Sequence, residues 1–582
     1  MIARLFTRAW GETQTLIART RRFSLVDLLV LAGLVGLVFA AQRIAHEWTG
    51  QLRPTVTIDL SLRALPRYTL FSLSRGLVAY AFSLGFTLVY GYWAAKDRLA
   101  ERVLIPLLDI LQSIPVLGFM PGLVLTLVAA FPSTNIGLEA AAVLMIFTGQ
   151  VWNMTFSYFH SLRSVPHDLD EAATVYRYSW WERLRWVELP HATLGLVWNS
   201  MMSMAGGWFF LMISEAFVLG NRDFRLPGIG AYMSVAVARG DSVAMFQAVV
   251  AMILMIVVLD QLLWRPVVVW SQRFRIEDSA GGGEAASSWF LTWLRRSRVL
   301  AWIGSRLRRL PHGRPRRAEA VTPAGAAPAA PRGPVVLVSH AAFAILLGAL
   351  AVGALQLGRL LQPVTPTQWI QMLGGALITL GRVLVSTAIG TLWTLPAGLA
   401  IGLSPRLSRA LQPITQVAAS FPAPMLFPVV VAALQASGIT LGFGSVLLML
   451  LGTQWYILFN VIAGAMAIPA DLREATITYR LPVFERFRRV YAPAVFPYLV
   501  TGWVTAAGGA WNASIVSEYV SYHGRTLTAP GIGARISVAA ERGDLPHLAA
   551  GVLVMSALVV IFNRTLWRRL YLIAEQRFSL SR

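Results

Sequence analysis

Twelve apolar runs, each long enough to cross a lipid bilayer as a helix, determine what this chain can fold into. A membrane-spanning helix needs about 20 predominantly apolar residues. Charged residues make up only 13% of the chain, about half of what a soluble domain carries. The sequence therefore predicts an all-α polytopic membrane protein. The runs form two sets of six, at 25–41, 76–93, 103–130, 138–160, 192–219 and 243–264, then at 335–357, 373–403, 411–434, 439–460, 495–518 and 546–563.

The basic residues predict the orientation of these spans. With the segment before the first run in the cytoplasm, the cytoplasmic segments hold 37 of the 50 Lys and Arg residues. Positive charge on short loops stays on the cytoplasmic side, so we expect both termini to be cytoplasmic. The segments counted are 1–24, 94–102, 161–190, 265–334, 404–410, 464–493 and 564–582.

The net charge of +22 does not indicate a nucleic-acid partner, because the basic residues lie between the apolar runs rather than on one soluble domain. The chain has no cysteine, which excludes a disulfide-stapled fold and thiolate chemistry. We expect no metal site, because the eight histidines are scattered without ligand spacing.

The second half of the sequence repeats the first. Adding 303 to a residue number gives its partner over a long stretch without a gap, and an offset of 307 holds earlier in the chain. Because each half has six predicted spans in the same orientation, the repeat is parallel rather than inverted. The matched residues include Gly149/Gly452, Trp152/Trp455, Trp208/Trp511, Glu215/Glu518, Arg75/Arg382 and Pro115/Pro422.

A segment of different composition separates the two repeats. We predict a first unit over 1–275, a linker over 276–334 and a second unit over 335–582. The linker is rich in Gly, Ala, Pro and Arg, which is typical of a flexible or extended spacer. Within it, residues 289–310 mix Trp, Leu and Ile with six arginines. This pattern suits an amphipathic helix on the anionic inner leaflet, with membrane lipid as its partner, or a solvated basic connector.

The longest matched polar segment lies on the predicted cytoplasmic side, at 165–190 and 468–493. It predicts a short amphipathic helix with a proline on each side, in which Val175, Trp181 and neighbouring apolar residues cover one face. Either this is a docking surface for a cytoplasmic partner, or it is a solvated loop whose pattern survives from duplication. The residues assigned to the surface are Asp168, Glu171, Ala172, Ala173, Arg177, Glu182 and Pro190, and Asp471, Glu474, Ala475, Arg480, Glu485 and Pro493.

At these residues the chain resembles the permeases of ABC-type importers. Glu171-Ala172-Ala173 followed by Val187, Leu189 and Pro190 is similar to their EAA loop, and Glu474-Ala475-Thr476 with Val490, Ala492 and Pro493 is a second, weaker copy. The glycine of that pattern is replaced by Arg177 and Arg480, a departure that bears on the tight turn between the two helices of the loop. The nitrate/sulfonate/bicarbonate–taurine type is the most similar, through Ser74-Arg75, Ile114-Pro115, Trp208 with Glu215, and Gly228-Ile-Gly230.

The resemblance implies a type I importer fold in which two permease units, fused in one chain, form the whole translocation path. It implies that two copies of a cytoplasmic ABC ATPase dock on the two loops, and that a periplasmic binding protein delivers a small solute. An anion such as nitrate, sulfonate, taurine or bicarbonate is the solute that this type suggests. Matched positions such as Phe209 and Asn512 differ, which makes the pore lining asymmetric.

The chain itself is not expected to be an enzyme or to bind a cofactor. Its one lysine, Lys96, lacks the glycine-rich loop of a phosphate-binding motif, so ATP and Mg²⁺ would be bound by the partner ATPase. The alternative function is an ion-coupled secondary transporter with two six-helix halves. That class needs ionisable groups near mid-membrane, where this sequence has almost none.

Ionisable residues inside spans are costly and are functional suspects. Glu215 and Glu518 lie near the predicted outer ends of their spans, close to Trp208 and Trp511 and within reach of Arg75 and Arg382. These six residues, Arg75, Trp208, Glu215, Arg382, Trp511 and Glu518, are the candidate pore or gate residues. The other interpretation is that they are buried pairs that hold helices together.

Overall fold

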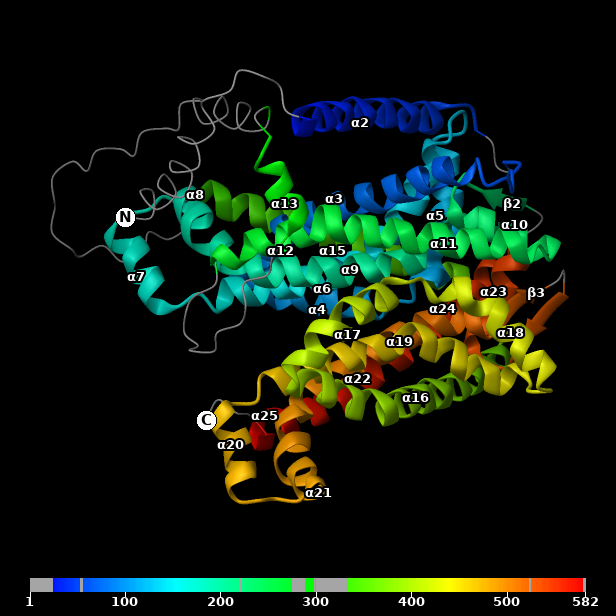
Figure 1. The fold of residues 1–582 in the computed structure, drawn as a ribbon. Coiled ribbons are helices and arrows are strands. Elements are labelled where there is room, and N and C mark those ends of the chain that lie inside the picture. The colour runs from blue at the N-terminus through cyan, green and yellow to red at the C-terminus, as the bar shows by residue number, and fades with distance from the viewer. Residues whose placement is uncertain are drawn as a thin grey trace.

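The computed structural model describes residues 25–52, 56–219, 222–274, 288–297, 299, 333–522 and 525–578, and helices make up most of them. The helices run along one common direction, and the two halves pack side by side (Figure 1).

The first half contains α2 (Leu25–Thr49), α3 (Leu65–Lys96), α4 (Arg98–Ser113), α5 (Val116–Ala130), α6 (Ile136–Arg163), α7 (His167–Val175), α8 (Trp180–Arg183), η1 (Leu184–Glu188), α9 (Leu189–Ser214), β1 (Ala216–Leu219), β2 (Arg222–Arg225), α10 (Ile229–Arg239), α11 (Ser242–Leu259), η2 (Asp260–Trp264), α12 (Arg265–Ser271) and η3 (Gln272–Phe274). One short helix, α13 (Trp289–Leu294), lies in the linker.

The second half contains α15 (Gly333–Leu361), α16 (Pro366–Leu403), α17 (Pro405–Ser420), η4 (Ala423–Leu426), α18 (Phe427–Ala436), α19 (Leu441–Met466), α20 (Ala470–Thr478), α21 (Val483–Arg486), η5 (Phe487–Tyr491), α22 (Ala492–Ser517), β3 (Tyr519–Tyr522), β4 (Arg525–Thr528), α23 (Ile532–Arg542), α24 (Leu545–Phe562), η6 (Asn563–Trp567) and α25 (Arg568–Phe578). From α16 onward, the long helices and the hairpin of the second half follow the same order as those from α3 onward in the first half, which confirms two repeated units.

Nine helices of the described residues are long and apolar enough to cross a membrane, or up to eleven if each of two bent pairs is one span. The one remaining predicted span, 335–357, falls within α15. The prediction of about twelve spans in two parallel sets is therefore confirmed at the level of the fold.

The prolines in the third apolar run of each half (Pro115 and Pro121; Pro422, Pro424 and Pro428) predict an interrupted span, and the structure has a sharp bend in each. α4 and α5 meet at 97°, and α17 meets the helix that starts at Ala423 at 84°. The breaks fall at Pro115 and Pro422, where a proline removes a backbone donor and disfavours helix in the residue before it.

The fifth span of the first half also ends earlier than predicted. α9 ends at Ser214, and the chain then forms an antiparallel hairpin in which β1 pairs with β2. β3 and β4 form the matching hairpin after α22. The predicted all-α fold is therefore confirmed, with these two small hairpins as its only strands among the described residues.

Contacts across the two halves bury the centre of the molecule. α5 packs against α22 and α24, and α9 packs against α17 and η4. One apolar core cluster contains residues of both halves, among them Met204, Trp208, Met425 and Trp511. The halves therefore form one body with an interface at its centre.

The linker touches the first half through α13 and the residues after it. The side-chain carboxylate of Asp27 on α2 is buried and accepts hydrogen bonds from Ser297 Oγ (2.8 Å) and Val299 N (3.1 Å). Only residues 289–294 of the predicted helix over 289–310 are described as α13, and most of the remainder lies outside the described residues.

Candidate functional site

The two predicted docking segments lie at the same end of the molecule. α7–α8 and α20–α21 project at the end where α25 also lies, and the two β-hairpins lie at the opposite end (Figure 1). This is the arrangement that a pair of loops facing one compartment requires.

Each segment is a helix–turn–helix rather than the single amphipathic helix predicted. In the first copy α7 ends in a turn in which Tyr178 N donates to Ala173 O (2.9 Å) and Arg177 N donates to Thr174 O (3.0 Å). These are the two hydrogen bonds of a Schellman motif. The second copy has the same pair, from Leu481 N and Arg480 N.

The turn places an arginine where a glycine is usual. Arg177 has φ 51° and Arg480 has φ 49°, and they are the only non-glycine residues with positive φ in the part of the chain that the structure describes. The left-handed region is unfavourable for residues with a Cβ. The tight turn is therefore kept in both loops although its glycine is missing.

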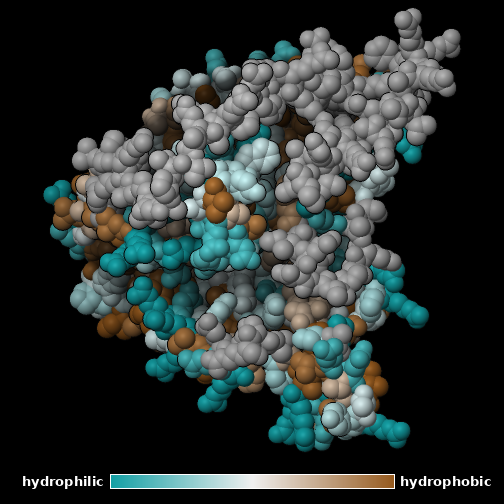
Figure 2. Space-filling view, turned by 90° about the vertical axis from the view of Figure 1, so that its left-hand side faces the viewer, coloured by the Kyte–Doolittle hydropathy of each residue, from teal (hydrophilic) through white to brown (hydrophobic). Residues whose placement is uncertain are grey.

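Both loops expose large apolar side chains. Val175 is 78% exposed and Trp180 is 65% exposed in the first copy, and Tyr479 and Val483 are 78% and 83% exposed in the second. Val175 and Trp181, which the sequence predicts on one face of a single helix, lie on the two separate helices α7 and α8, and Trp181 is itself 52% exposed. Figure 2 views this end, and its lowest projection, α20–α21, carries hydrophobic next to hydrophilic surface.

The assigned docking residues divide into exposed and structural ones. Ala173, on α7, is buried, while Ala475 and the prolines Pro190 and Pro493 are half-buried. The remaining exposed members are Asp168, Glu171, Ala172 and Arg177, and Asp471, Glu474 and Arg480.

Glu182 and Glu485 shape the second helix of each loop. Ser179 and Glu182 form a capping box at the start of α8. Hydrogen bonds from the backbone N–H and the hydroxyl of Ser179 hold the pKa of Glu182 below its usual range. In the second copy Glu485 instead pairs with Arg489 at 3.5 Å.

At the opposite end, the first half contains a fully buried ion cluster. Arg75 on α3 donates to Glu215 Oε1 (2.8 Å) and to both oxygens of Glu139 (2.5 and 2.7 Å), and all three side chains are inaccessible to solvent. Glu215 also accepts from Ser72 Oγ and from the backbone of Gly230. The pairing of Arg75 with Glu215 follows the sequence prediction, whereas Glu139 was missed because it sits inside an apolar run.

The second half has a simpler version of the cluster. Arg382 Nη1 donates to Glu518 Oε1 (2.7 Å) and to Pro530 O (2.8 Å), and its Nε donates to the backbone oxygen of Gly442 (3.1 Å). Glu518 also accepts from Thr379 Oγ1 and Gly533 N. A backbone carbonyl thus takes the place of the second carboxylate.

The segment that joins each hairpin to the next helix approaches these carboxylates so closely that only glycine fits. A Cβ built on Gly228 would collide with the Glu215 carboxylate, and one on Gly531 would collide with that of Glu518. The Gly-Ile-Gly matches in the two halves are therefore explained by close backbone approach. Each cluster ties α3 or α16 to the hairpin end of its half.

The two tryptophans among the candidate gate residues, Trp208 and Trp511, are both buried. Trp208 is 2% exposed and packs against Gly76, where a Cβ would lie 2.7 Å from its ring. Trp511 is 3% exposed and lines a central pocket between the halves. None of the four charged gate candidates lines that pocket, so their geometry is that of buried helix-holding pairs.

The central pocket has a volume of about 190 Å³ and is lined by residues of α4–α6 and α9 from the first half and of α17, η4, α19 and α22 from the second. Among the described residues that line it, none is Asp, Glu, Lys, Arg or His. The break of α5 reaches it, and Val116 N donates across the halves to Asn512 Oδ1 (2.8 Å).

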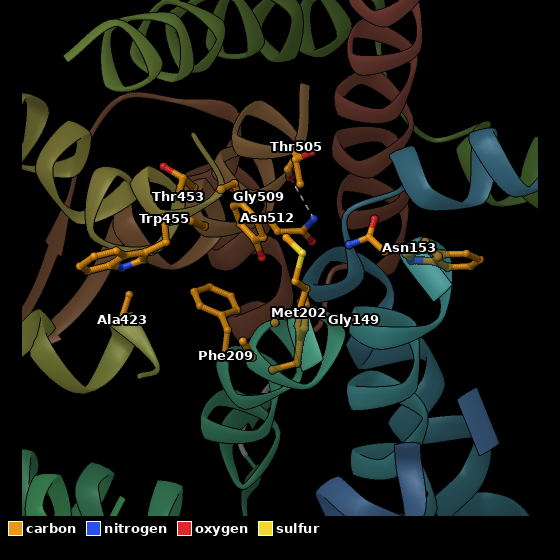
Figure 3. Close-up of a pocket in the computed structure, with 18 of the residues that line it drawn as sticks. Gly149, Asn153, Met202, Phe209, Ala423, Thr453, Trp455, Thr505, Gly509 and Asn512 are labelled. Carbon is orange, nitrogen blue, oxygen red and sulfur yellow. Dashed lines mark hydrogen bonds between the residues drawn. The ribbon is translucent and has the colours of Figure 1, made fainter. Parts of the chain in front are cut away.

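Matched positions of α9 and α22 give the pocket two different walls. Met202 and Phe209 on α9 correspond to Thr505 and Asn512 on α22, and they project toward one another from opposite sides (Figure 3). Phe210 likewise corresponds to Ala513. At these matched positions the first half supplies large apolar side chains and the second half smaller or polar ones, so the lining is asymmetric, as the sequence comparison of the halves predicts.

Comparison with known protein families matches both halves. The model of the binding-protein-dependent transport system inner membrane component family matches residues 87–263 and 390–579. These two ranges contain both loops and most of the pocket. The chain belongs to this family, and it is an ABC transporter permease with two permease units in one polypeptide.

Individual relatives match one part of the chain. The bicarbonate transport system permease protein CmpB of Synechocystis sp. is 29% identical over 144 residues, which are 25% of this chain and 50% of the relative. The nitrate import permease protein NrtB of the same organism is 29% identical over 140 residues, 24% of this chain and 50% of the relative. A putative aliphatic sulfonates transport permease protein, SsuC of Bacillus subtilis, is 25% identical over 144 residues, 25% of this chain and 49% of the relative. The chain spans about half the length of the curated relatives it matches.

Proposed function

We propose that this chain is the membrane permease of an ATP-driven importer, in which two cytoplasmic ABC ATPase subunits dock on α7–α8 and α20–α21. The observation that carries the proposal is that both loops project at one end and expose large apolar side chains there. Exposed aromatic groups next to charged ones are the usual make-up of a protein interface. ATP and Mg²⁺ belong to the ATPases, and the loops and both termini face the cytoplasm of a bacterial inner membrane.

The central pocket is the proposed translocation path. A solute delivered by a periplasmic binding protein at the hairpin end would meet the pocket at the interface of the two permease units. Its lining offers amide and hydroxyl groups, such as those of Asn153, Asn512 and Thr505, but no charge. Uncharged groups hold an anion weakly enough to release it, which conduction requires.

The solute we propose is a small anion: nitrate, bicarbonate or a sulfonate, for which relatives are named, or taurine, which the sequence resemblance implies. Of these solutes, an organic sulfonate, which has one charged and one apolar end, fits the two unlike walls best. The uncharged lining also argues against the alternative of an ion-coupled secondary transporter, since proton or ion coupling uses ionisable groups at this depth.

The docking proposal is tested by purifying the chain from membranes together with the ATPase. The double variant Glu171→Arg, Glu474→Arg should lose the ATPase, because both side chains are exposed on the first helix of their loops. Glu541→Arg, at the hairpin end, is the matched charge reversal and should keep it. Retention of the ATPase and of its hydrolysis by the double variant would refute the docking role.

The path proposal is tested by filling the pocket. A Cβ on Gly508 meets no atom within 4 Å, so Gly508→Phe should fill the pocket without disturbing the fold. We expect it to abolish uptake while the ATPase stays bound. Gly374→Phe, on an exposed face of α16 with equally open space, is the control. Normal uptake by Gly508→Phe would show that the solute passes elsewhere.

A further inference from the structure

We propose that the two docking segments, α7–α8 and α20–α21, transmit motion unequally, because among the described residues only the first is joined to its neighbouring transmembrane helix by a chain of ion pairs. The proposal rests on the proposed function, in which ATPases move both loops. It assigns positioning roles to Asp170, Arg183, Glu188 and Lys96, none of which was singled out as a docking residue.

The chain of ion pairs runs from the loop to the end of α3. Asp170 on α7 pairs with Arg183 Nη2 at the end of α8. Arg183 Nε donates to Glu188 Oε1 (3.1 Å), and Lys96 Nζ, on the last residue of α3, donates to the same oxygen (2.5 Å). The Glu188 side chain is 3% exposed. Charge-assisted hydrogen bonds of this kind are about twice as strong as neutral ones.

Within the part of the chain that the structure describes, the first helix of this loop has few other contacts with the body. Ala173 is the one buried residue of α7. α8 gains a second contact with α3, since the Trp180 and Tyr92 rings lie 6.3 Å apart. A displacement of α7 therefore reaches α3 mainly through Arg183 and Glu188.

The residues at the equivalent positions of the second half cannot form this chain of ion pairs. Asp170, Arg183 and Glu188 correspond to Arg473, Arg486 and Tyr491, and Lys96 corresponds to Leu403 at the end of α16. The correspondence at the helix ends is secure, because Asp97 and Ser404, the next residues, both cap the following helix. Two arginines thus stand where the first half has an ion pair.

The second loop is held by other means. Arg486 Nε donates to the backbone oxygen of Leu481 (2.6 Å), within the loop itself. Leu403, Phe487 and Tyr491 pack in an apolar cluster. Apolar contacts are non-directional and let surfaces slide, whereas the ion-pair chain fixes the loop to α3 at defined atoms.

The consequence extends along α3 to the far end of the molecule. α3 carries Lys96 at the loop end and Arg75, with its buried carboxylates, at the hairpin end. The first loop, α3 and the first hairpin are therefore linked by ion pairs at both ends of one helix. We infer that closure of the ATPases moves the first half as a unit and the second half more loosely.

The test uses two matched reporters in the naturally cysteine-free chain. Met202→Cys and Thr505→Cys stand at equivalent pocket positions of α9 and α22. In the full complex with its ATPase, the rate of maleimide labelling is measured with and without ATP plus vanadate. We expect Lys96→Met and Glu188→Gln to reduce the nucleotide response at the Met202→Cys reporter about tenfold, the scale of one lost hydrogen bond to a charged group, and to leave the Thr505→Cys reporter within twofold.

Controls separate this inference from loss of folding and from failure of the proposed function. Lys96→Arg keeps the charge and should restore the response, and Leu403→Met is the matched change in the second half and should have no effect. Equal responses at both reporters in Lys96→Met, or an equal loss in Leu403→Met, would overturn the inference while leaving the importer function intact. If the parent chain binds no ATPase or shows no nucleotide response at either reporter, the proposed function itself fails.

Discussion

The two buried clusters near the hairpins predict a difference between equivalent glutamates. Glu215→Gln removes one of two carboxylates from Arg75, which keeps its two hydrogen bonds to Glu139. Glu518→Gln removes the one carboxylate that pairs with Arg382 and leaves that guanidinium with backbone oxygens. The second change should therefore be the more destabilising of the two.

The magnitude follows from what each arginine retains. In both variants an amide group replaces an oxygen that accepts from a backbone N–H, Gly230 N in one half and Gly533 N in the other. That mismatch costs about 1–3 kcal/mol and cancels in the comparison. Glu518→Gln also leaves the charge of Arg382 buried without a carboxylate, and breaking a buried ion pair in this way costs about 3–5 kcal/mol in total. Glu518→Gln should therefore be more destabilising than Glu215→Gln by about 2 kcal/mol.

The assay is thermal unfolding of the purified chain in one detergent, with the fraction of monodisperse protein followed by size exclusion. Glu518→Gln should melt well below Glu215→Gln, and Glu139→Gln should resemble the latter. The double variant Glu139→Gln, Glu215→Gln strips Arg75 of both carboxylates and should fall to the level of Glu518→Gln. A Glu215→Gln variant that melts at or below Glu518→Gln would refute this reading of the clusters.

Three further predictions concern the turns at Arg177 and Arg480, the close approach of Gly531 and the cap of α8. Arg177→Gly and Arg480→Gly relieve a left-handed arginine, which is unfavourable by about 1–2 kcal/mol, and should slow amide exchange in the turn that follows; faster exchange would contradict it. Gly531→Ala should destabilise the hairpin end by roughly 1–3 kcal/mol, as measured by melting, because its Cβ displaces a pinned carboxylate; an unchanged melting temperature would contradict it. Ser179→Ala should raise the pKa of Glu182 toward its usual value, because the hydroxyl that donates to the carboxylate is lost. In the parent chain the ionised Glu182 stabilises the start of α8. This contribution is fully present above the pKa of Glu182 in the unfolded state and is lost as the pH falls through its lower pKa in the folded state. Exchange at the start of α8 in acid checks this, and a pH profile unchanged by the substitution would contradict it.

The repeated pattern made much of the fold predictable. Apolar length identified the spans, and the offsets of 303 and 307 residues placed the loops and the Arg75–Glu215 and Arg382–Glu518 pairs in equivalent positions. Equivalence is a strong guide because two copies of one unit bury the same positions.

Local breaks were harder to predict from hydropathy. Pro115 and Pro422 lie in apolar runs, and a sliding average does not separate a kinked helix from the bends of 97° and 84° that occur. The hairpins were missed because each strand has only four residues, too few for an alternating pattern to stand out beside an apolar run.

Positions where the two halves differ held the remaining surprises. Glu139 and Lys96 have no charged partner in the second half, so the search for matched residues passed over them. The arginines in the turns were noted as a departure, but the sequence does not show that the turn geometry is kept at φ 51° and 49°.

The central claim is that α7–α8 and α20–α21 both face the cytoplasm and are covered by the ATPase. The direct measurement is labelling of Val175→Cys and Val483→Cys, which replace side chains that are 78% and 83% exposed, with a membrane-impermeant maleimide. Both cysteines should react in inside-out vesicles, remain unreactive in intact cells and be protected when the ATPase is bound. Reaction of either one from the outer face, or equal reaction with and without the ATPase, would contradict the claim.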